Sequence, residues 1–447
     1  MPDSLTNTLY DILRRPLNDA DRHRAVLHLI DWIGCAALGA TTATGAVFTT
    51  YREALGSGRC SVVCGGRSAS ASSAAFANGA LGNIHEMDDI HRSSILHPGP
   101  VVIPAVLAAA EAFDLSADAF LGGIVRGYDA MIRVGRATGP GHYRYWHKTG
   151  SCGPFGAAAG AAFALGLDRE EFVSALGNAG STAGGLWQCR HEPVMTKQWH
   201  TARAAEGGFV AALMARDGLT GPAFILEGEQ GFFAAMAPDA WPEAVTSEPD
   251  GPWLIYDTSF KPWPACRHAH PTIDAALAAR EDLGDRLGAV TGLTIETYAD
   301  AARFCDRPVP TSEIEAKFSL QHAAAVTLLR GAPGLTDFDG ERRDDPAIVA
   351  LRDKARVVVA EDFEARYPDH YGAALTAQFE DGSRLRFETQ DASGDPARPL
   401  DDKAIRAKAA TLLAAADLEA GAIDALIEAT LALPETDDLE PFLRRLP

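Results

Sequence analysis

The segment from His85 to Pro104, HEMDDIHRSSILHPGPVVIP, combines three carboxylates and three imidazoles within its first thirteen residues. Arg92 is the one fixed cation among them. So many ionisable side chains in a short segment are costly to fold unless they face water, a ligand or each other. We therefore expect the chemistry of this protein to lie here.

Two other interpretations of this segment stay open. As a metal site it offers imidazole and carboxylate ligands, with His85 and Asp88 or Asp89 on one face if the segment is helical. The pattern is not HExxH, because its last position is Asp89. The second alternative is an acidic helix C-terminus whose charged side chains are simply solvated. The ligand candidates are His85, Glu86, Asp88, Asp89, His91 and His97.

A second candidate segment is GHYRYWHKTGSCGPFGAAAGAAFALGL, which begins at Gly141. His147, Lys148 and Thr149 lie where this segment enters an Ala-rich helix. We expect Ser151 to cap that helix and Pro154 to occupy its first turn. Free N–H groups at a helix start suit a carboxylate, although a plain helix start explains the same pattern.

A third segment, MTKQWHTARAAEGG, begins at Met195 and spaces Lys197, His200 and Arg203 three residues apart. We expect one helical face to carry these basic side chains, either around an anion or as a solvated face.

A fourth segment, FKPWPACRHAHPTIDAAL, begins at Phe260 and contains Lys261, Cys266, Arg267 and two histidines among prolines. Rigid polar backbone of this kind often forms a site wall, and it can equally be a linker.

The elements that must position these segments fall into two groups. Small and apolar residues at helical spacing predict helices from Ser4 to about Leu226 and again from Asp402 to Leu433. Between them, alternating residues predict strands at 290–298 and from 356, a helix at 313–329, and a hairpin that turns at Asp381-Gly382. The predicted fold is mainly α with an α+β second domain: residues 1–259 with 396–447, and residues 260–395.

Length, charge and cysteine content exclude several classes of protein. A chain of 447 residues is too long for one hydrophobic core of usual size. A net charge of −20 argues against a nucleic-acid or anionic-membrane surface but not against a small anion bound by local cations. The seven cysteines are scattered, and no run reads as a signal peptide or membrane span, so we expect a cytoplasmic protein.

Taken in order, the four segments resemble the MmgE/PrpD family, and the resemblance runs nearly end to end. It rests on DD…HPG…PA from Asp88, HxTGxxGxFGAAA from His147 and MTKxxHxxxAAxxG from Met195, followed by DGLTGPAFILEGEQGFF, KPWPAC and KFSL. The resemblance implies a large helical domain formed by both chain ends, a smaller α+β lid domain, a homodimer, and no metal or organic cofactor. It also implies a small di- or tricarboxylate substrate and carbanion chemistry beside a carboxylate.

That chemistry needs an acid, a base and fixed cations. By motif position we expect His97 and His147 to be acid and base, Asp88 or Asp89 to orient one imidazole, and Lys197 and Lys261 to hold carboxylates. The other expected substrate-binding residues are Glu86, His91, Arg92, Thr149, Arg203, Cys266, Arg267 and His322.

This chain departs from the family's branches at several positions. Glu86 stands where dehydratases and decarboxylases usually carry Asp, whereas Cys266 and His322 replace the His and Tyr of the decarboxylase branch. Cys266 resembles the epimerase branch. We expect a lyase that dehydrates a 2-methylcitrate-like acid, with epimerisation of an iminodisuccinate-like dicarboxylate or silent carboxylate binding as alternatives.

Overall fold

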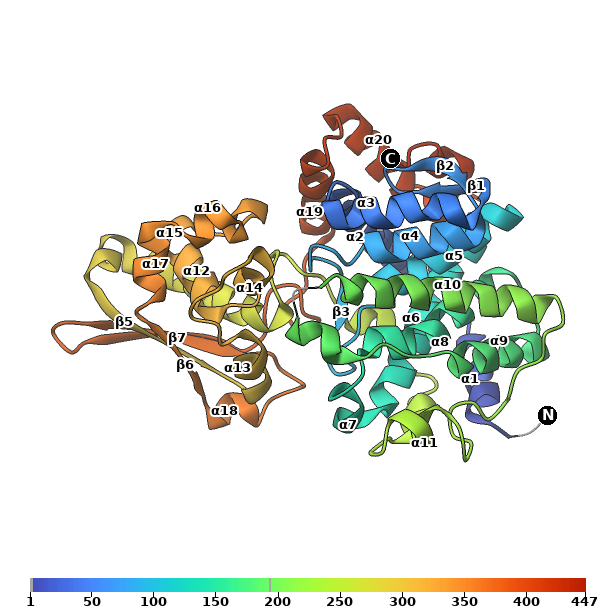
Figure 1. Cartoon of the computed structure of the whole chain (residues 1–447), viewed down its shortest axis with the longest axis horizontal. Helices are drawn as coiled ribbons and strands as arrows, with labels where there is room; N and C mark the ends of the chain where they lie inside the picture. Colours follow the sequence, from blue (N-terminus) through green and yellow to red (C-terminus); the bar gives the residue numbers. More distant parts are fainter. Residues whose placement is uncertain (1–2, 193) are drawn as a thin grey trace. The chain divides into compact units, whose positions relative to one another are not determined.

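The computed structural model describes residues 3–192 and 194–447. The chain forms two compact units, Met1–Thr258 with Asp401–Pro447, and Ser259–Leu400. The first unit is built mainly of helices and the second combines helices with a four-stranded sheet (Figure 1). The predicted fold class, mainly α with an α+β second part, is confirmed.

Both ends of the chain contribute helices to the first unit. Its hydrophobic core contains residues from the N-terminal helices and, beyond the inserted second unit, from α19 to α21. The helices are α1 (Leu5–Leu13), α2 (Asp19–Ala40), α3 (Ala43–Tyr51), α4 (Ala71–Leu81), α5 (Gly99–Phe113), α6 (Ala117–Ala137), α7 (Gly139–Tyr143), α8 (Lys148–Ala164), α9 (Arg169–Ser181), α10 (Thr196–Arg216), α11 (Phe232–Met236), α19 (Asp402–Ala415), α20 (Ala420–Leu431) and α21 (Glu440–Leu443).

Glycines let the central helices α6 and α8 approach each other closely. A Cβ atom at Gly127 would lie 2.9 Å from the carbonyl oxygen of Gly156, and one at Gly156 would lie 2.8 Å from the carbonyl oxygen of Gly127. A side chain at either position would force the two backbones apart. The small residues of the sequence therefore serve helix packing, as their pattern predicted.

Neighbouring glycines in α10 give a direct test of this packing. A Cβ atom at Gly208 would lie 2.3 Å from Ala157 Cβ and 2.7 Å from the Pro154 carbonyl oxygen, whereas one at Gly207 would meet nothing within 4 Å. We expect Gly208→Ala to lower the free energy of unfolding by about 1–3 kcal/mol, the usual cost of overpacking. Gly207→Ala should raise it by about 0.5–1 kcal/mol, because alanine favours helix. Urea denaturation measures both values, and equal effects at the two positions would contradict the packing.

The first unit also contains short strands within the region that the sequence predicts to be helical. Strand β1 (Ser57–Val62) pairs in antiparallel fashion with β2 (Gly66–Ala69), and β3 (Ile90–His91) is a further short strand. The turn between β1 and β2 includes Gly66 at a φ of 77°. Neither short strand alternates between exposed and buried residues, so the usual sequence pattern of a strand is missing here.

The second unit is built around a mixed sheet with strand order β6-β5-β7-β8. Strand β5 (Val290–Thr297) runs parallel to β6 (Ala355–Val359), and antiparallel to β7 (Ala373–Phe379), which pairs in turn with β8 (Arg384–Thr389). Gly382 turns the β7–β8 hairpin with a φ of 81°, as predicted. Its helices are α12 (His270–Leu283), α13 (Ala299–Cys305), α14 (Glu313–Lys317), α15 (Leu320–Arg330), α16 (Gly340–Arg343), α17 (Pro346–Arg352) and α18 (Glu361–Glu364), and β4 (Thr258–Ser259) precedes them.

Two predicted helices begin or end differently. The single helix expected at 313–329 is divided into α14 and α15, because Ser319 caps α15 by accepting a hydrogen bond from the His322 N–H at 3.0 Å. Helix α8 begins at Lys148, so Ser151 and Pro154 lie inside it rather than at its cap and first turn.

Among the described residues, no single helix is long and apolar enough to cross a membrane. Helices α2 and α3 pass that test only as a pair bent by 96°, and most of α2 is buried within the unit.

Candidate active site

Asp89 fixes the loop between α4 and α5 to the helices around it. Its carboxylate accepts hydrogen bonds from the Gly99 N–H at 2.9 Å, the Tyr128 hydroxyl at 2.7 Å and His28 Nδ1 at 2.6 Å. These partners lie on α5, α6 and α2. Both oxygens of Asp89 are thus committed to holding the loop, and the imidazole that this carboxylate orients is His28.

Asp88 is the carboxylate that orients His97. His97 Nδ1 lies 2.8 Å from Asp88 Oδ2 and 2.9 Å from the carbonyl oxygen of Asp89. Because both neighbours of Nδ1 are acceptors, we assign the ring proton to Nδ1, which leaves Nε2 with a free lone pair in the neutral ring. Asn83 Nδ2 donates to the same Asp88 oxygen at 2.8 Å and so fixes the carboxylate.

Lys408, from α19, holds the backbone of this loop. Its ammonium nitrogen lies 2.6 Å from the Met87 carbonyl oxygen and 2.6 Å from Asp31 Oδ1. The side chains of Lys408 and Asp31 are only 6% and 2% exposed. Burial raises the pKa of Asp31 to about 6, against the opposing effect of the Lys408 charge. The buried Lys408–Asp31 ion pair is therefore bonded to the backbone of Met87, the residue before Asp88.

His147 stands at the entrance of α8, next to a second imidazole. Its Nδ1 lies 3.2 Å from Nδ1 of His200 on α10, and its ring lies against Trp187 with a centroid distance of 4.3 Å. The backbone N–H of His147 donates to the Gly185 carbonyl oxygen at 2.8 Å. Burial lowers the pKa of His147 well below 6.5, and the neighbouring His200, Lys197 and His97 lower it further. The resting imidazole is therefore neutral at pH 7.

Thr149 connects the two catalytic candidates. Its hydroxyl oxygen accepts a hydrogen bond from the backbone N–H of His97 at 3.1 Å. Thr149 lies two residues after His147, in the first turn of α8. His97, His147 and His200 form what we call the imidazole cluster.

His200 is the third member of this cluster. Burial lowers the pKa of His200 to about 4, and the positive charge of Lys197 lowers it further.

Glu86 and Lys197 form an ion pair beside this cluster. Their side chains are 5% and 18% exposed, so much of the Lys197 charge is balanced within the protein. Glu86 adopts a φ of 59°, a left-handed conformation that is uncommon for a residue with a side chain. The strain at Glu86 is consistent with a carboxylate that is held at a functional position.

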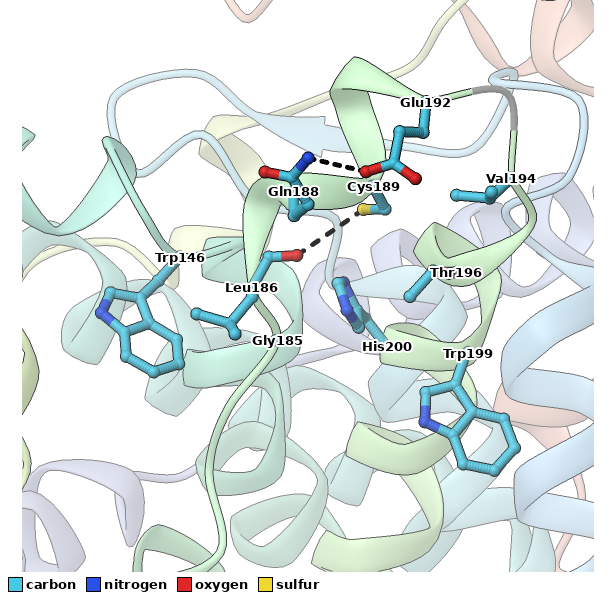
Figure 2. A pocket seen from close by; sticks show the side chains of 10 residues that line it. All are labelled: Trp146, Gly185, Leu186, Gln188, Cys189, Glu192, Val194, Thr196, Trp199 and His200. Atoms are coloured by element: carbon cyan, nitrogen blue, oxygen red, sulfur yellow. Dashed lines mark hydrogen bonds between the residues drawn. The ribbon is translucent and has the colours of Figure 1, made fainter.

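A surface cavity of about 620 Å³ borders the cluster at His200. Figure 2 shows the His200 ring between the 185–189 segment and the start of α10, with Cys189 above it. Aromatic and aliphatic side chains form much of the wall; the lining residues are Trp146, Gly185, Leu186, Gln188, Cys189, Glu192, Val194, Thr196, Trp199 and His200.

His91 and Arg92 lie in the same loop but in a different environment. Both ring nitrogens of His91 have partners, Ser94 Oγ at 2.7 Å and Asp257 Oδ2 at 3.1 Å. Burial lowers the pKa of His91, and the positive charges of Arg136 and Arg92 add to that effect. His91 therefore serves the loop itself, and the partly buried Arg92 lies close to it.

The expectation that Lys197, His200 and Arg203 share one helical face is wrong. His200 is buried, whereas the Arg203 side chain is 56% exposed and forms an ion pair with Glu206 on the same helix. Residues at i and i+6 lie about 120° apart around a helix, at 100° per residue. Arg203 consequently points away from the imidazole cluster.

Three predicted site residues of the second unit lie in the loop before α12. Lys261 is 1% exposed and Cys266 is 8% exposed. The Arg267 guanidinium is buried, forms an ion pair with Asp395 and donates to the Ser393 carbonyl oxygen at 3.1 Å. Arg267 thus joins this loop to the 392–395 segment. These contacts occupy the guanidinium of Arg267, and its role in binding a substrate stays a prediction.

His322 lies in the core of the second unit. It is fully buried, its Nε2 lies 2.9 Å from the Asp337 carbonyl oxygen, and its ring packs against Phe338. These contacts hold the His322 ring within the second unit, and its role in binding a substrate stays a prediction.

The carboxylates of the 85–97 segment do not converge. Asp89 caps α5, Asp88 orients His97 and Glu86 pairs with Lys197. In the part of the chain that the structure describes, no three His, Cys, Asp or Glu side chains are arranged to hold a metal ion.

Sequence reasoning missed three residues of the site. His200 was read only as part of a basic face, although it precedes a small-residue run that the helix buries. Asn83 and Lys408 carried no local signal, since their role depends on tertiary contacts with Asp88 and Met87.

The buried imidazoles predict a pH dependence of stability. Burial lowers the pKa of His28, His142 and His200 to about 4 and that of His268 to about 3. Below an unfolded pKa of about 6.5, the unfolded chain binds protons that the folded protein does not. Each group therefore destabilises the fold by up to about 1.4 kcal/mol per pH unit as the pH falls from about 6.5 toward its folded pKa. The raised pKa values of Asp31 and Glu111 act in the opposite direction. Burial also lowers the pKa of His91, His147 and His322, so the imidazoles outnumber these two carboxyls.

Urea denaturation at pH 7.5, 6 and 5 measures this effect. We expect the free energy of unfolding to fall by several kcal/mol between pH 7.5 and pH 5. A constant value down to pH 5 would show that these imidazoles are not held neutral.

The fold and the site together define a class of protein. It has two units, and its mainly helical unit buries a cluster of imidazoles next to two carboxylates, Asp88 bound to His97 and Glu86 bound to Lys197. The family model of the MmgE/PrpD N-terminal domain matches residues 4–244, and that of the C-terminal domain matches residues 263–433. The chain belongs to the MmgE/PrpD family.

Named relatives are similar to this chain over most or about half of its length. A cis-aconitate decarboxylase-like protein of Aspergillus oryzae is 27% identical over 450 residues, which cover 94% of this chain and 92% of that protein. The cis-aconitate decarboxylase of Homo sapiens is 27% identical over 91% of this chain and 86% of its own length. The 2-methylcitrate dehydratase of Salmonella typhimurium is 29% identical over 49% of this chain and 48% of its own length.

Proposed function

We propose that the protein is a lyase that acts on a small di- or tricarboxylate by removing a proton next to a carboxylate, with dehydration of a 2-methylcitrate-like acid as the first candidate reaction. The observation that carries the proposal is the contrast between two imidazoles that lie close together. His97 is bound to a carboxylate, whereas His147 is bound to another imidazole and is kept neutral.

This contrast suits an acid and a base. The Asp88 carboxylate stabilises a positive charge on His97 through a charge-assisted hydrogen bond, so His97 is proposed as the acid that protonates the leaving hydroxyl. His147, neutral at rest, is proposed as the base that takes the α-proton through Nε2. An anionic substrate beside His147 raises its proton affinity, because negative charge favours the imidazolium.

The carboxylate groups of the substrate need cations. Lys197 is the proposed ligand in the helical unit, and Glu86 restricts where its ammonium can lie. Lys261 remains a proposed ligand of a second carboxylate. Developing negative charge on the carbanion is stabilised by such fixed charges.

Decarboxylation is the second candidate, favoured by the near full-length similarity to decarboxylases. Both reactions pass through a carbanion beside a carboxylate, and epimerisation would use the same base.

Proton NMR in D2O with 2-methylcitrate, citrate, cis-aconitate and iminodisuccinate tests the proposal. Water loss from 2-methylcitrate or citrate gives a new alkene resonance. Decarboxylation of cis-aconitate gives a methylene product, and epimerisation gives exchange or inversion without an alkene. The His147→Asn variant is the control for contaminating activity. Silence of the unsubstituted protein across the panel would contradict the proposal.

A further inference from the structure

The partner of His147 is unusual for a proposed base, because it is an imidazole and not a carboxylate. The two Nδ1 atoms of His147 and His200 lie 3.2 Å apart and share a single proton. Either His147 donates and keeps a bare Nε2, or His200 donates and His147 carries its proton on Nε2. Only the first arrangement leaves His147 able to accept a proton from substrate.

The surroundings of the two rings favour the first arrangement. His147 is 2% exposed and packs against Trp187, whereas the ring of His200 lines the open cavity of about 620 Å³ (Figure 2). A proton on His200 Nε2 can therefore be donated to cavity water. With its proton on Nε2, His200 has a free lone pair on Nδ1. That Nδ1 atom accepts the proton that His147 donates from its own Nδ1.

We propose that His200 is a positioning residue that fixes the tautomer of His147, accepting its Nδ1–H and leaving Nε2 as the base. This inference rests on the proposed function of His147. In the proton-transfer step the substrate C–H bond breaks, its electron pair stays on carbon, and the proton binds Nε2 of His147. The Nδ1–H bond to His200 remains and spreads the new positive charge over two rings.

Local charge explains why an imidazole is the suitable partner. The groups that act on His147 are the positive Lys197 and the rings of His97 and His200. A carboxylate at position 200 would stabilise the imidazolium and hold His147 protonated at rest, as an acid. A neutral partner fixes the ring while leaving it neutral.

Kinetics of the full-length protein test the role of His200 if the protein turns over one of the carboxylates above. His200→Ala should lower kcat by between about tenfold and the 10⁴-fold that a wrong tautomer costs a serine protease. KM should change little, since His200 is not a proposed substrate contact. His200→Asn, which keeps an acceptor near the Nδ1 position, should restore most of kcat. Added imidazole should do the same for His200→Ala, because the cavity opens onto the vacated position.

Two controls separate this role from general damage. His142→Asn removes a buried imidazole of the same unit that bonds to Ser151 and Met236, and it should leave kcat of the folded fraction near its original value. 1,2,4-Triazole has the size of imidazole but is a far weaker acceptor, and it should not restore His200→Ala. An unchanged kcat in His200→Ala, or a loss that neither asparagine nor imidazole restores, would overturn the inference.

A spectroscopic test does not depend on turnover. In protein labelled with ¹⁵N-histidine, the His147 ring should be protonated at Nδ1 in the unsubstituted protein and should lose that preference in His200→Ala. His147 protonated at Nε2 in the unsubstituted protein would overturn the inference even if the enzyme is active. Protonation at Nδ1 without turnover of any carboxylate would support the pair and reject the proposed reaction.

Discussion

Replacing His147 with asparagine is expected to lower kcat by about 10²–10⁴-fold, the usual contribution of a general acid or base. Asparagine keeps a polar group near His200 but cannot take a proton from carbon. Because the pKa of His147 lies well below 6.5, its base form persists on acidification. In the unsubstituted protein, kcat/KM should therefore show no loss due to this group until the pH is well below 6.5.

His142 provides the comparison for this variant. It is a buried imidazole of the same unit, bonded to Ser151 Oγ at 2.7 Å and to the Met236 carbonyl oxygen at 2.9 Å, and both of these partners lie outside the imidazole cluster. His142→Asn should lower stability and leave kcat of the folded fraction near its original value. Steady-state kinetics with thermal unfolding separates the two effects; equal kcat losses would mean that His147 acts through the fold.

Asp88→Asn is the second substitution with a large expected effect. An amide in place of the carboxylate can donate to His97 Nδ1, which favours the wrong tautomer and removes the negative charge that stabilises the imidazolium. A comparable change in a serine protease lowers kcat about 10⁴-fold, and we expect a loss of about 10²–10⁴-fold here. Asn83 donates to the same Asp88 oxygen that faces His97 Nδ1, so an amide nitrogen at that position also leaves Asn83 without its acceptor. Thermal unfolding measures the accompanying loss of stability separately from the loss of kcat.

Asp89→Asn supplies the contrast, one residue away. Asp89 holds His28, Tyr128 and the start of α5, and none of these is a proposed catalytic group. This variant should lower the free energy of unfolding by about 1–3 kcal/mol per buried group left unsatisfied, with a smaller effect on kcat than Asp88→Asn. The reverse pattern would assign the orienting role to the wrong carboxylate.

How far the sequence predicts this molecule depends on how local each signal is. The helices, the second unit's strands and the Gly382 turn follow from spacing and turn residues within short windows. Two features do not follow from such windows. The β1–β2 hairpin is a short strand pair within a long helical pattern, and the division between α14 and α15 depends on the Ser319 cap within a run that otherwise predicts one helix.

The candidate site shows the same limit. His97 and His147 were singled out through motifs, and the structure places them close enough for the charge of one to affect the other. The His147–His200 contact joins residues 53 positions apart, and its geometry comes from the packing of α8 against α10. Arg203, on the same helix as His200, was misplaced because two steps of three residues turn its side chain about 120° away from that of Lys197.

The ion pair of Lys408 with Asp31 has a consequence for the order in which the protein is made. Lys408 reaches the Met87 carbonyl oxygen across 321 positions of sequence, and the whole second unit lies between them. During synthesis, when chains grow from the N-terminus, the loop that carries Asp88 is complete long before its buried anchor leaves the ribosome. Lys408 can therefore secure this loop only after the whole second unit has been synthesised.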